Sequence, residues 1–197
     1  MGLISATKQL YLGARFPADT AYAALISREA MKVGKRLAQE GVLGRFAVDF
    51  VVVRRPDGNW EPFAIELNLR KGGTTHPFLT LEYLTDGVYN AETGVFLTPS
   101  GQEKHLVASD HMESPLFRLF NPDSLMDIAI RHGLHFDHTR QTGVIFHMMA
   151  SMAEIGRIGA TAIANSPDEA DRLYQKFEDL LLSEADEALQ LVAISED

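Results

Sequence analysis

The amino-acid sequence predicts an α+β fold with a mainly antiparallel sheet. The strongest observation is a hairpin pattern within residues 45–77, where two apolar runs flank a short turn. A second observation is an apolar stripe of helical period in residues 18–40, which Gly41 ends. A third is another pair of β-rich runs around the turn at residues 99–102. Strands joined by such short turns pair antiparallel.

The remaining elements follow in chain order. Strands are expected at residues 10–14, 95–98, 104–109, 144–149 and 160–164. Helices are expected at residues 18–40, at 77–86 before Gly87, and between Asn121-Pro122 and Gly133. Ser166 and Glu169 have the spacing of a capping box, which predicts a further helix that buries Leu173, Phe177, Leu180 and Leu181. We expect the strands at 95–98 and 104–109 to form a second hairpin.

The composition is that of a globular chain. Its 197 residues are 46% hydrophobic and 23% charged, and no cysteine is present, which excludes disulfides, thiolate zinc sites and cysteine nucleophiles. A net charge of -9 argues against a nucleic-acid partner. No apolar run approaches the roughly 20 residues that span a membrane. Because the N-terminus has no signal-peptide pattern, a cytoplasmic location without a membrane partner is expected.

Two acidic residues interrupt the apolar runs of the first hairpin. Asp49 and Glu66 stand where core side chains would be expected. A four-residue loop at 56–59 would pair Arg55 with Trp60, and that register places Asp49 directly opposite Glu66. A two-residue loop gives the same register. Directly opposed side chains project from the same face of a hairpin.

Asn68 shares this face because it lies two residues beyond Glu66. Two carboxylates and an amide oxygen suit Mg²⁺, which takes hard oxygen ligands. A buried, unpaired carboxylate is costly, so such groups are normally paired or bound to a metal ion. The alternative is that arginines neutralise the two acids, and the nearby candidates are Arg45, Arg54, Arg55 and Arg70.

The segment after Asn68 has the composition of an anion-binding loop. It contains Arg70, Lys71, Gly72, Gly73, Thr74, Thr75 and His76, followed by the helix from Pro77. Glycines allow close approach of the backbone, and a Thr-capped helix N-terminus offers N–H groups to an anion. Arg70 can bind a phosphate or carboxylate in bidentate fashion. His76 is a candidate contact to a substrate carboxylate, or a helix cap.

These residues resemble the ATP-grasp superfamily. The arrangement of Asp49 on one strand and the motif Glu66-x-Asn68-x-Arg70 on the next is similar to its metal-binding hairpin. The run from Glu66 to Pro77 is similar to the ATP-grasp peptide ligases of the pheganomycin type, as are residues 12–17 and 143–148. The resemblance implies a carboxylate–amine ligase that uses ATP and Mg²⁺ (or Mn²⁺) and acts through an acyl phosphate.

The resemblance also implies residue roles and a domain organisation. Asp49, Glu66 and Asn68 would bind Mg²⁺, with Glu66 bridging two ions, and Arg70 would steady the carboxylate and its acyl phosphate. Residues 1–197 would form one C-terminal region, with the metal hairpin in 9–86 and a family-specific part in 87–197. We expect the N-terminal subdomain that clasps the nucleotide to be absent. A separate chain could supply it, and the other expected partners are small carboxylate and amine substrates and a possible second copy of the chain.

Three alternatives remain at this stage. The chain could be a non-catalytic remnant or interaction module that still binds metal, or a metal-dependent phosphohydrolase using the same acids. His132, His135, Asp137 and His138 could form a His-carboxylate metal site, although their spacing is loose. His147 lies in an apolar strand and is interpreted as a core residue.

Overall fold

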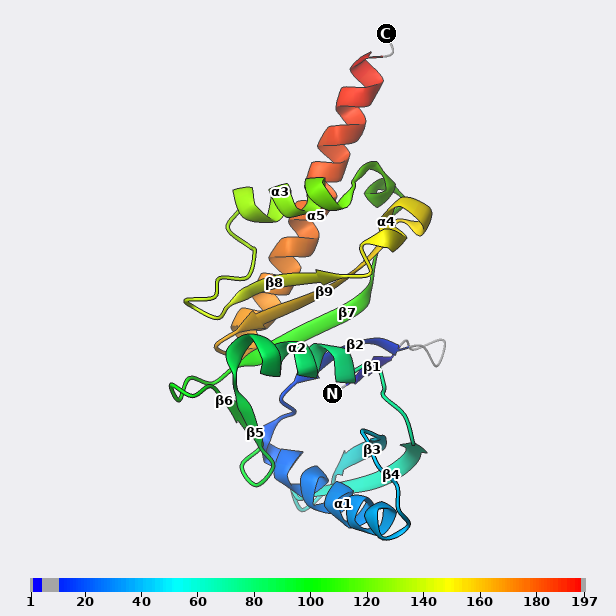
Figure 1. Ribbon diagram of the computed structural model, residues 1–197, viewed down its shortest axis with the longest axis vertical. Helices are drawn as coiled ribbons and strands as arrows, with labels where there is room; N and C mark the ends of the chain where they lie inside the picture. Colours follow the sequence, from blue (N-terminus) through cyan, green and yellow to red (C-terminus); the bar gives the residue numbers. More distant parts are fainter. Residues whose placement is uncertain (1, 5–10, 196–197) are drawn as a thin grey trace. The chain divides into compact units, whose positions relative to one another are not determined.

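The computed structural model describes residues 2–4 and 11–195, and their side chains from residue 12 to residue 190. The chain divides into two compact units. The first, the hairpin unit, comprises Pro17–Glu103, and the second, the sheet unit, combines Gly2–Phe16 with Lys104–Asp197. Every pairing between named strands is antiparallel, and helices accompany the strands in both units (Figure 1). The predicted α+β class is therefore confirmed.

The hairpin unit contains two helices and two pairs of antiparallel strands. Its elements are α1 (Thr20–Gln39), β3 (Ala47–Arg54), β4 (Trp60–Asn68), α2 (Thr75–Thr85), β5 (Val88–Asn90) and β6 (Val95–Leu97). Asp19 caps α1 by accepting a hydrogen bond from the N–H of Ala21 at 2.8 Å. One face of β3–β4 packs against α1, where the Tyr22 and Trp60 rings lie 5.2 Å apart.

The turn of the β3–β4 hairpin differs from the predicted one. Arg54 pairs with Trp60, and the N–H of Arg55 donates to the carbonyl of Asn59 at 2.7 Å. The loop thus has three residues, and its Gly58 adopts a φ of 87°. The predicted pairing of Arg55 with Trp60 is wrong, because a left-handed glycine allows this shorter loop.

The sheet unit contains a five-stranded sheet in the order β1-β2-β7-β9-β8. Its elements are β1 (Gly2–Ile4), β2 (Tyr11–Phe16), β7 (His105–Glu113), the 3-10 helix η1 (Pro115–Leu119), α3 (Pro122–Arg131), β8 (Gly143–His147), α4 (Ala150–Ile155), β9 (Arg157–Ala164) and α5 (Pro167–Ser195). Leu10, part of a predicted strand, lies outside the described residues. The core joins the sheet, α3 and α5, and Phe177 and Leu181 of α5 are completely buried in it.

The predicted caps of this unit are present. Asn121 caps α3 by accepting from the N–H of Ser124 at 2.8 Å, and Gly133 follows that helix with a φ of 63°. Ser166 accepts from the N–H of Glu169 at 3.2 Å, and the Glu169 carboxylate accepts from the N–H of Asn165 at 3.2 Å. The reciprocal contact therefore reaches one residue further back than in the usual capping box.

The predicted second hairpin is wrong. β6 pairs with β5, which the sequence analysis did not predict, whereas β7 joins β2 and β9 in the sheet unit. Only the turn survives, as an isolated bridge between Leu97 and Glu103. The physical reason is burial, because Leu106, Val107 and Ala108 of β7 are 2–5% exposed within the larger sheet. A three-residue partner such as β6 could not cover them.

The helix after the glycine loop begins earlier than predicted. α2 spans Thr75–Thr85 and ends at Asp86, which adopts a left-handed φ of 52°. Gly87 does not close the helix but lies against Phe96, where an added Cβ would approach the ring to 2.2 Å. The side chain of Thr74 occupies the cap position without a capping hydrogen bond. The expectation of a Thr-capped N-terminus is therefore wrong.

Candidate functional site

Asp49, Glu66 and Asn68 converge on one face of the β3–β4 hairpin. Asp49 lies opposite Glu66, and Asn68 lies opposite Ala47, two residues from Asp49 on the same face. The amide Nδ2 of Asn68 donates a hydrogen bond to Oδ2 of Asp49 at 3.3 Å. The predicted grouping of these three side chains is thus present in the structure.

Partial desolvation and the neighbouring carboxyl both affect the pKa of Asp49. Asp49 and Glu66 are both exposed, so the expectation that they occupy core positions is wrong. Partial desolvation raises the pKa of Asp49 above its usual value, and the neighbouring Glu66 carboxyl raises it further. The Arg70 guanidinium acts in the opposite direction and lowers this pKa. Two carboxylates that repel each other favour a cation between them.

The nearby arginines are mostly engaged elsewhere. Arg45 pairs with Glu82 at 3.3 Å, and Arg55 pairs with Glu61. The guanidinium of Arg54 lies over the Trp60 ring, 5.9 Å from its centroid. Neither Asp49 nor Glu66 forms an ion pair within 4.0 Å in the part of the chain that the structure describes. The alternative of arginine neutralisation therefore reduces to the longer-range effect of Arg70.

The donor set fits a hard divalent ion. Asn68 donates through Nδ2, so its carbonyl oxygen is the atom that remains for a metal ion. Two carboxylates and one carbonyl oxygen match the preference of Mg²⁺ for oxygen ligands. Within residues 2–4 and 11–195, no group of three or more His, Asp or Glu side chains gathers as a metal site. The candidate site has only two acidic side chains, and its third ligand is the amide of Asn68.

The glycine-rich segment forms a tight turn between β4 and α2. The N–H of Gly72 donates to Oγ1 of Thr75 at 3.1 Å, and the N–H of Thr75 donates back to the carbonyl of Gly72 at 3.1 Å. Lys71, Gly73, Thr74 and His76 are exposed around this turn. The side chain that holds the turn is therefore Thr75.

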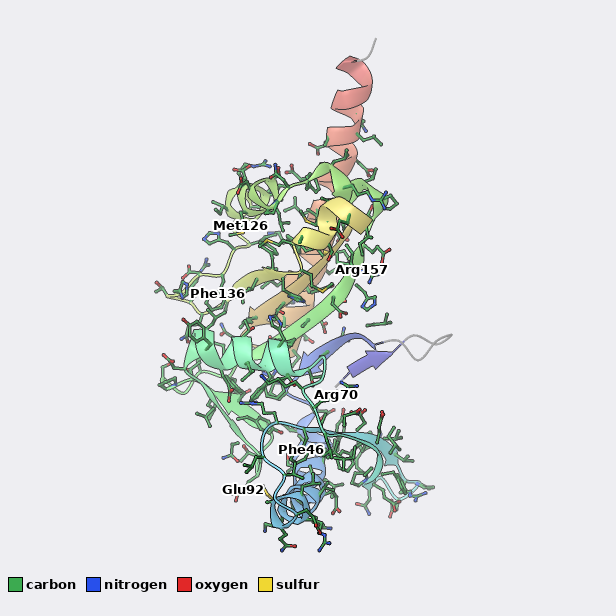
Figure 2. The ribbon with its side chains drawn as sticks, turned by 45° about the vertical axis from the view of Figure 1, so that its right-hand side comes forward. Phe46, Arg70, Glu92, Met126, Phe136 and Arg157 are labelled. Atoms are coloured by element: carbon green, nitrogen blue, oxygen red, sulfur yellow. The ribbon has the colours of Figure 1, made fainter. Side chains whose placement is uncertain are left out.

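A cavity of about 300 Å³ adjoins the same turn within the hairpin unit. It is lined by Gly44, Arg45, Phe46, Thr74, Thr75 and Phe78. Phe46 precedes β3 and Arg70 follows β4, and Figure 2 shows both near the same end of the hairpin. The sequence analysis did not assign Gly44 and Phe46 to the site. Their position directly before β3 was the available signal, since an antiparallel hairpin brings its two outer ends together.

The histidine-rich segment after α3 does not form a metal centre. His132 Nε2 lies 3.1 Å from Oε1 of Glu184, and Asp137 accepts a hydrogen bond from Nε of Arg140 at 2.8 Å. These candidate ligands do not gather into a group of three or more within the described residues. His147 is half-buried in β8 against Gly159, where an added Cβ would lie 2.1 Å from the imidazole ring. This position agrees with a packing role.

The sequence is similar to one protein family and to one characterised ligase. Residues 125–177 match the family described as the PGM1 C-terminal domain. The chain is also 30% identical over 161 residues to an L-propargylglycine–L-glutamate ligase from Streptantibioticus cattleyicolor. The chain is therefore similar to the PGM1 C-terminal domain over residues 125–177, and to this ligase over most of its own length. No solved structure shows a significant match.

The extent of the two matches differs. The PGM1 C-terminal domain covers α3, β8, α4, β9 and the first part of α5 in the sheet unit. The similarity to the ligase covers 82% of this chain but 32% of the ligase. This chain therefore matches about a third of its relative's length. No helix in the described residues is both long enough and apolar enough to cross a membrane.

Proposed function

We propose that this chain provides the metal-binding C-terminal part of an ATP- and Mg²⁺-dependent carboxylate–amine ligase. The observation that carries the proposal is the convergence of Asp49, Glu66 and Asn68 on one hairpin face. The similarity to an amino-acid ligase supports the reaction class. Mg²⁺ would supply charge neutralisation for a phosphoryl transfer from ATP to a carboxylate, which is how metal ions assist such reactions.

The chain's own residues have distinct roles in this proposal. Asp49 and Glu66 hold the metal ion, and Asn68 contributes its carbonyl oxygen. Arg70 lies close enough to lower the pKa of Asp49, and it binds the carboxylate substrate through its guanidinium. The turn from Lys71 to His76 presents backbone N–H groups and the Lys71 ammonium to phosphate oxygens.

The reaction needs a nucleotide clasp and two substrates. The chain matches a third of the related ligase, so we assign the clasp to a segment outside the matched region or to a separate chain. The substrates are a small carboxylate and a small amine, which combine after the carboxylate is phosphorylated. ATP and Mg²⁺ are abundant in the cytoplasm, which is the proposed place of action.

A chimera tests this function. The matched third of the Streptantibioticus ligase is replaced by this chain, and ADP and amide formation are measured with both amino-acid substrates and with the amine omitted. We expect ADP formation that needs both substrates and falls about 100-fold or more in Glu66→Gln. Glu61→Gln is the control, because Glu61 lies on the same strand but pairs with Arg55.

The same assay separates the alternatives. Phosphate release that does not require an amine would indicate a phosphohydrolase. If the chimera is inactive although the isolated chain binds Mn²⁺, the result would support a metal-binding remnant and would contradict the ligase function.

A further inference from the structure

The sheet unit contains a cavity of about 530 Å³ that the proposed ligase reaction does not use. Its walls come from β2, β7 and the first turns of α5. Leu12, Val107 and Ala108 form the apolar part of the lining, and the remainder includes polar side chains and charged side chains of both signs. A cavity with an apolar wall and a few placed polar groups is the usual form of a small-ligand site.

Two backbone features occur in the strands that line this cavity. Gly13 approaches β7 so closely that an added Cβ would lie 2.2 Å from the carbonyl oxygen of Ala108, and its φ is +154°. β7 carries an irregularity between Ser109 and Met112 in its pairing with β9. Such bulges re-aim side chains, and they are common beside functional sites. Here the irregularity includes His111, which lines the cavity.

One end of the cavity is rich in guanidinium groups. Nη2 of Arg15 lies 2.7 Å from Oδ1 of Asp171, and Arg172 is the next residue on α5. Because Arg15 is already paired with a carboxylate, Arg172 supplies the additional positive charge at this end.

The other end is acidic. Ser109 contacts the Tyr174 hydroxyl, and the charges of Glu178 and Asp110 act on the same hydroxyl. Burial is the first cause of the raised pKa of Tyr174, and the two carboxylates raise it further. Nδ1 of His111 bonds to Oδ1 of Asp110 at 2.5 Å. An ammonium group would relieve the negative charge around this hydroxyl.

The spacing of the two ends selects a ligand length. Arg172 and Glu178 are six residues apart on α5, which corresponds to about 9 Å along the helix axis. A free amino acid separates its ammonium and carboxylate by much less. Two or three extended residues span about 7–10 Å. A ligand that spans the cavity and carries charges of only one sign would meet a like charge at one end.

We propose that this cavity binds a short zwitterionic peptide of two or three residues. Its ammonium group lies at Glu178, its carboxylate lies at Arg172, and its small apolar side chains contact Leu12 and Val107. This site is independent of the hairpin and of the proposed ligase function.

Calorimetric titration of trialanine into the complete chain tests the site. The titration is done in EDTA without nucleotide, so its result does not depend on the metal site. We expect binding that weakens about tenfold or more when the peptide is N-acetylated or C-amidated, because each cap removes one charged end. Free alanine should bind at least about tenfold more weakly than trialanine.

Matched variants on α5 assign the two ends. Glu178→Gln should remove the discrimination against the N-acetylated peptide, and Arg172→Gln should remove the discrimination against the C-amidated peptide. Glu187→Gln and Lys176→Gln make the same charge changes at exposed positions outside the cavity and should leave both ratios unchanged. Equal affinity for free and capped peptides, equal affinity for alanine and trialanine, or no binding at millimolar concentration would overturn the proposal.

Discussion

Asp49 lies opposite Glu66 because Ile65 is an extra, unpaired residue on β4. Phe50 pairs with Ala64, and the next pair along the hairpin is Asp49 with Glu66. The bulge at Ile65 therefore changes the register by one residue. Without it, Asp49 would face Ile65, which is 65% exposed, and Glu66 would project from the other side of the hairpin.

The first prediction concerns the stability cost of this acidic pair. The folded-state pKa of Asp49 is raised, first by desolvation and then by Glu66, so its ionised form destabilises the fold. Asp49→Asn should raise the melting temperature at pH 7 in EDTA by a small amount, on the order of 1–2 °C after solvent screening. Differential scanning fluorimetry measures this change.

The pH dependence of the stability difference between Asp49→Asn and the wild type tests the direction of the pKa shift. A raised carboxyl pKa contributes stability that is present at low pH and is lost as pH rises through the interval between the unfolded and folded values. The advantage of Asp49→Asn should therefore shrink as pH falls from 7 towards the ordinary aspartate pKa of 3.8. An advantage that grows on acidification would contradict the assigned direction.

The second prediction concerns Lys104, which is 1% exposed. Its Nζ donates to the carbonyls of Arg140 and Gln141 at 2.9 Å and to Oδ1 of Asn165 at 2.8 Å. Lys104→Met leaves these three acceptors without their donor and should destabilise the chain by about 2–4 kcal/mol. Thermal denaturation monitored by circular dichroism measures the loss.

Lys176→Met is the control for that measurement. Lys176 is exposed on α5, so the same chemical change should alter stability by less than about 0.5 kcal/mol. Comparable losses in the two variants would show that the buried contacts of Lys104 contribute little.

The first hairpin shows how far sequence reasoning reaches. Two apolar runs and the turn residues around Gly58 predicted both strands, and Asp49 was correctly placed opposite Glu66. The pairing was derived from a continuous register, whereas the structure combines a shorter loop with a bulge at Ile65. The shorter loop shifts the register by one residue and the bulge shifts it back by one, so the predicted pairing of Asp49 with Glu66 is restored. A bulge depends on tertiary packing, so the local sequence does not reveal it.

The remaining differences have the same origin in long-range contacts. The turn at residues 99–102 suggested a local hairpin, but β7 pairs with β9, more than forty residues later. The cavity beside Tyr174 combines β2, β7 and α5, so no single motif could have indicated it. The exposure of Asp49 and Glu66 was also not predicted, because strands of nearly continuous apolar residues were expected to be buried on both faces.

The third prediction concerns the close approach of β2 to β7. Gly13→Ala would place a Cβ 2.2 Å from a backbone oxygen at a φ of +154°, and the strands must separate to accept it. We expect a loss of at least about 2–3 kcal/mol. Gly58→Ala, at a φ of +87° with open space around it, should cost about 1 kcal/mol. Equal melting temperatures for the two variants would contradict the role of steric contact at Gly13.

The most direct measurement is a calorimetric titration of Mn²⁺ into the wild-type chain and three single variants. We expect Asp49→Asn and Glu66→Gln each to weaken binding at least about tenfold while leaving the fold intact. Glu61→Gln, on the same hairpin, should bind like the wild type. Equal affinity in all four proteins would contradict a metal site between Asp49, Glu66 and Asn68.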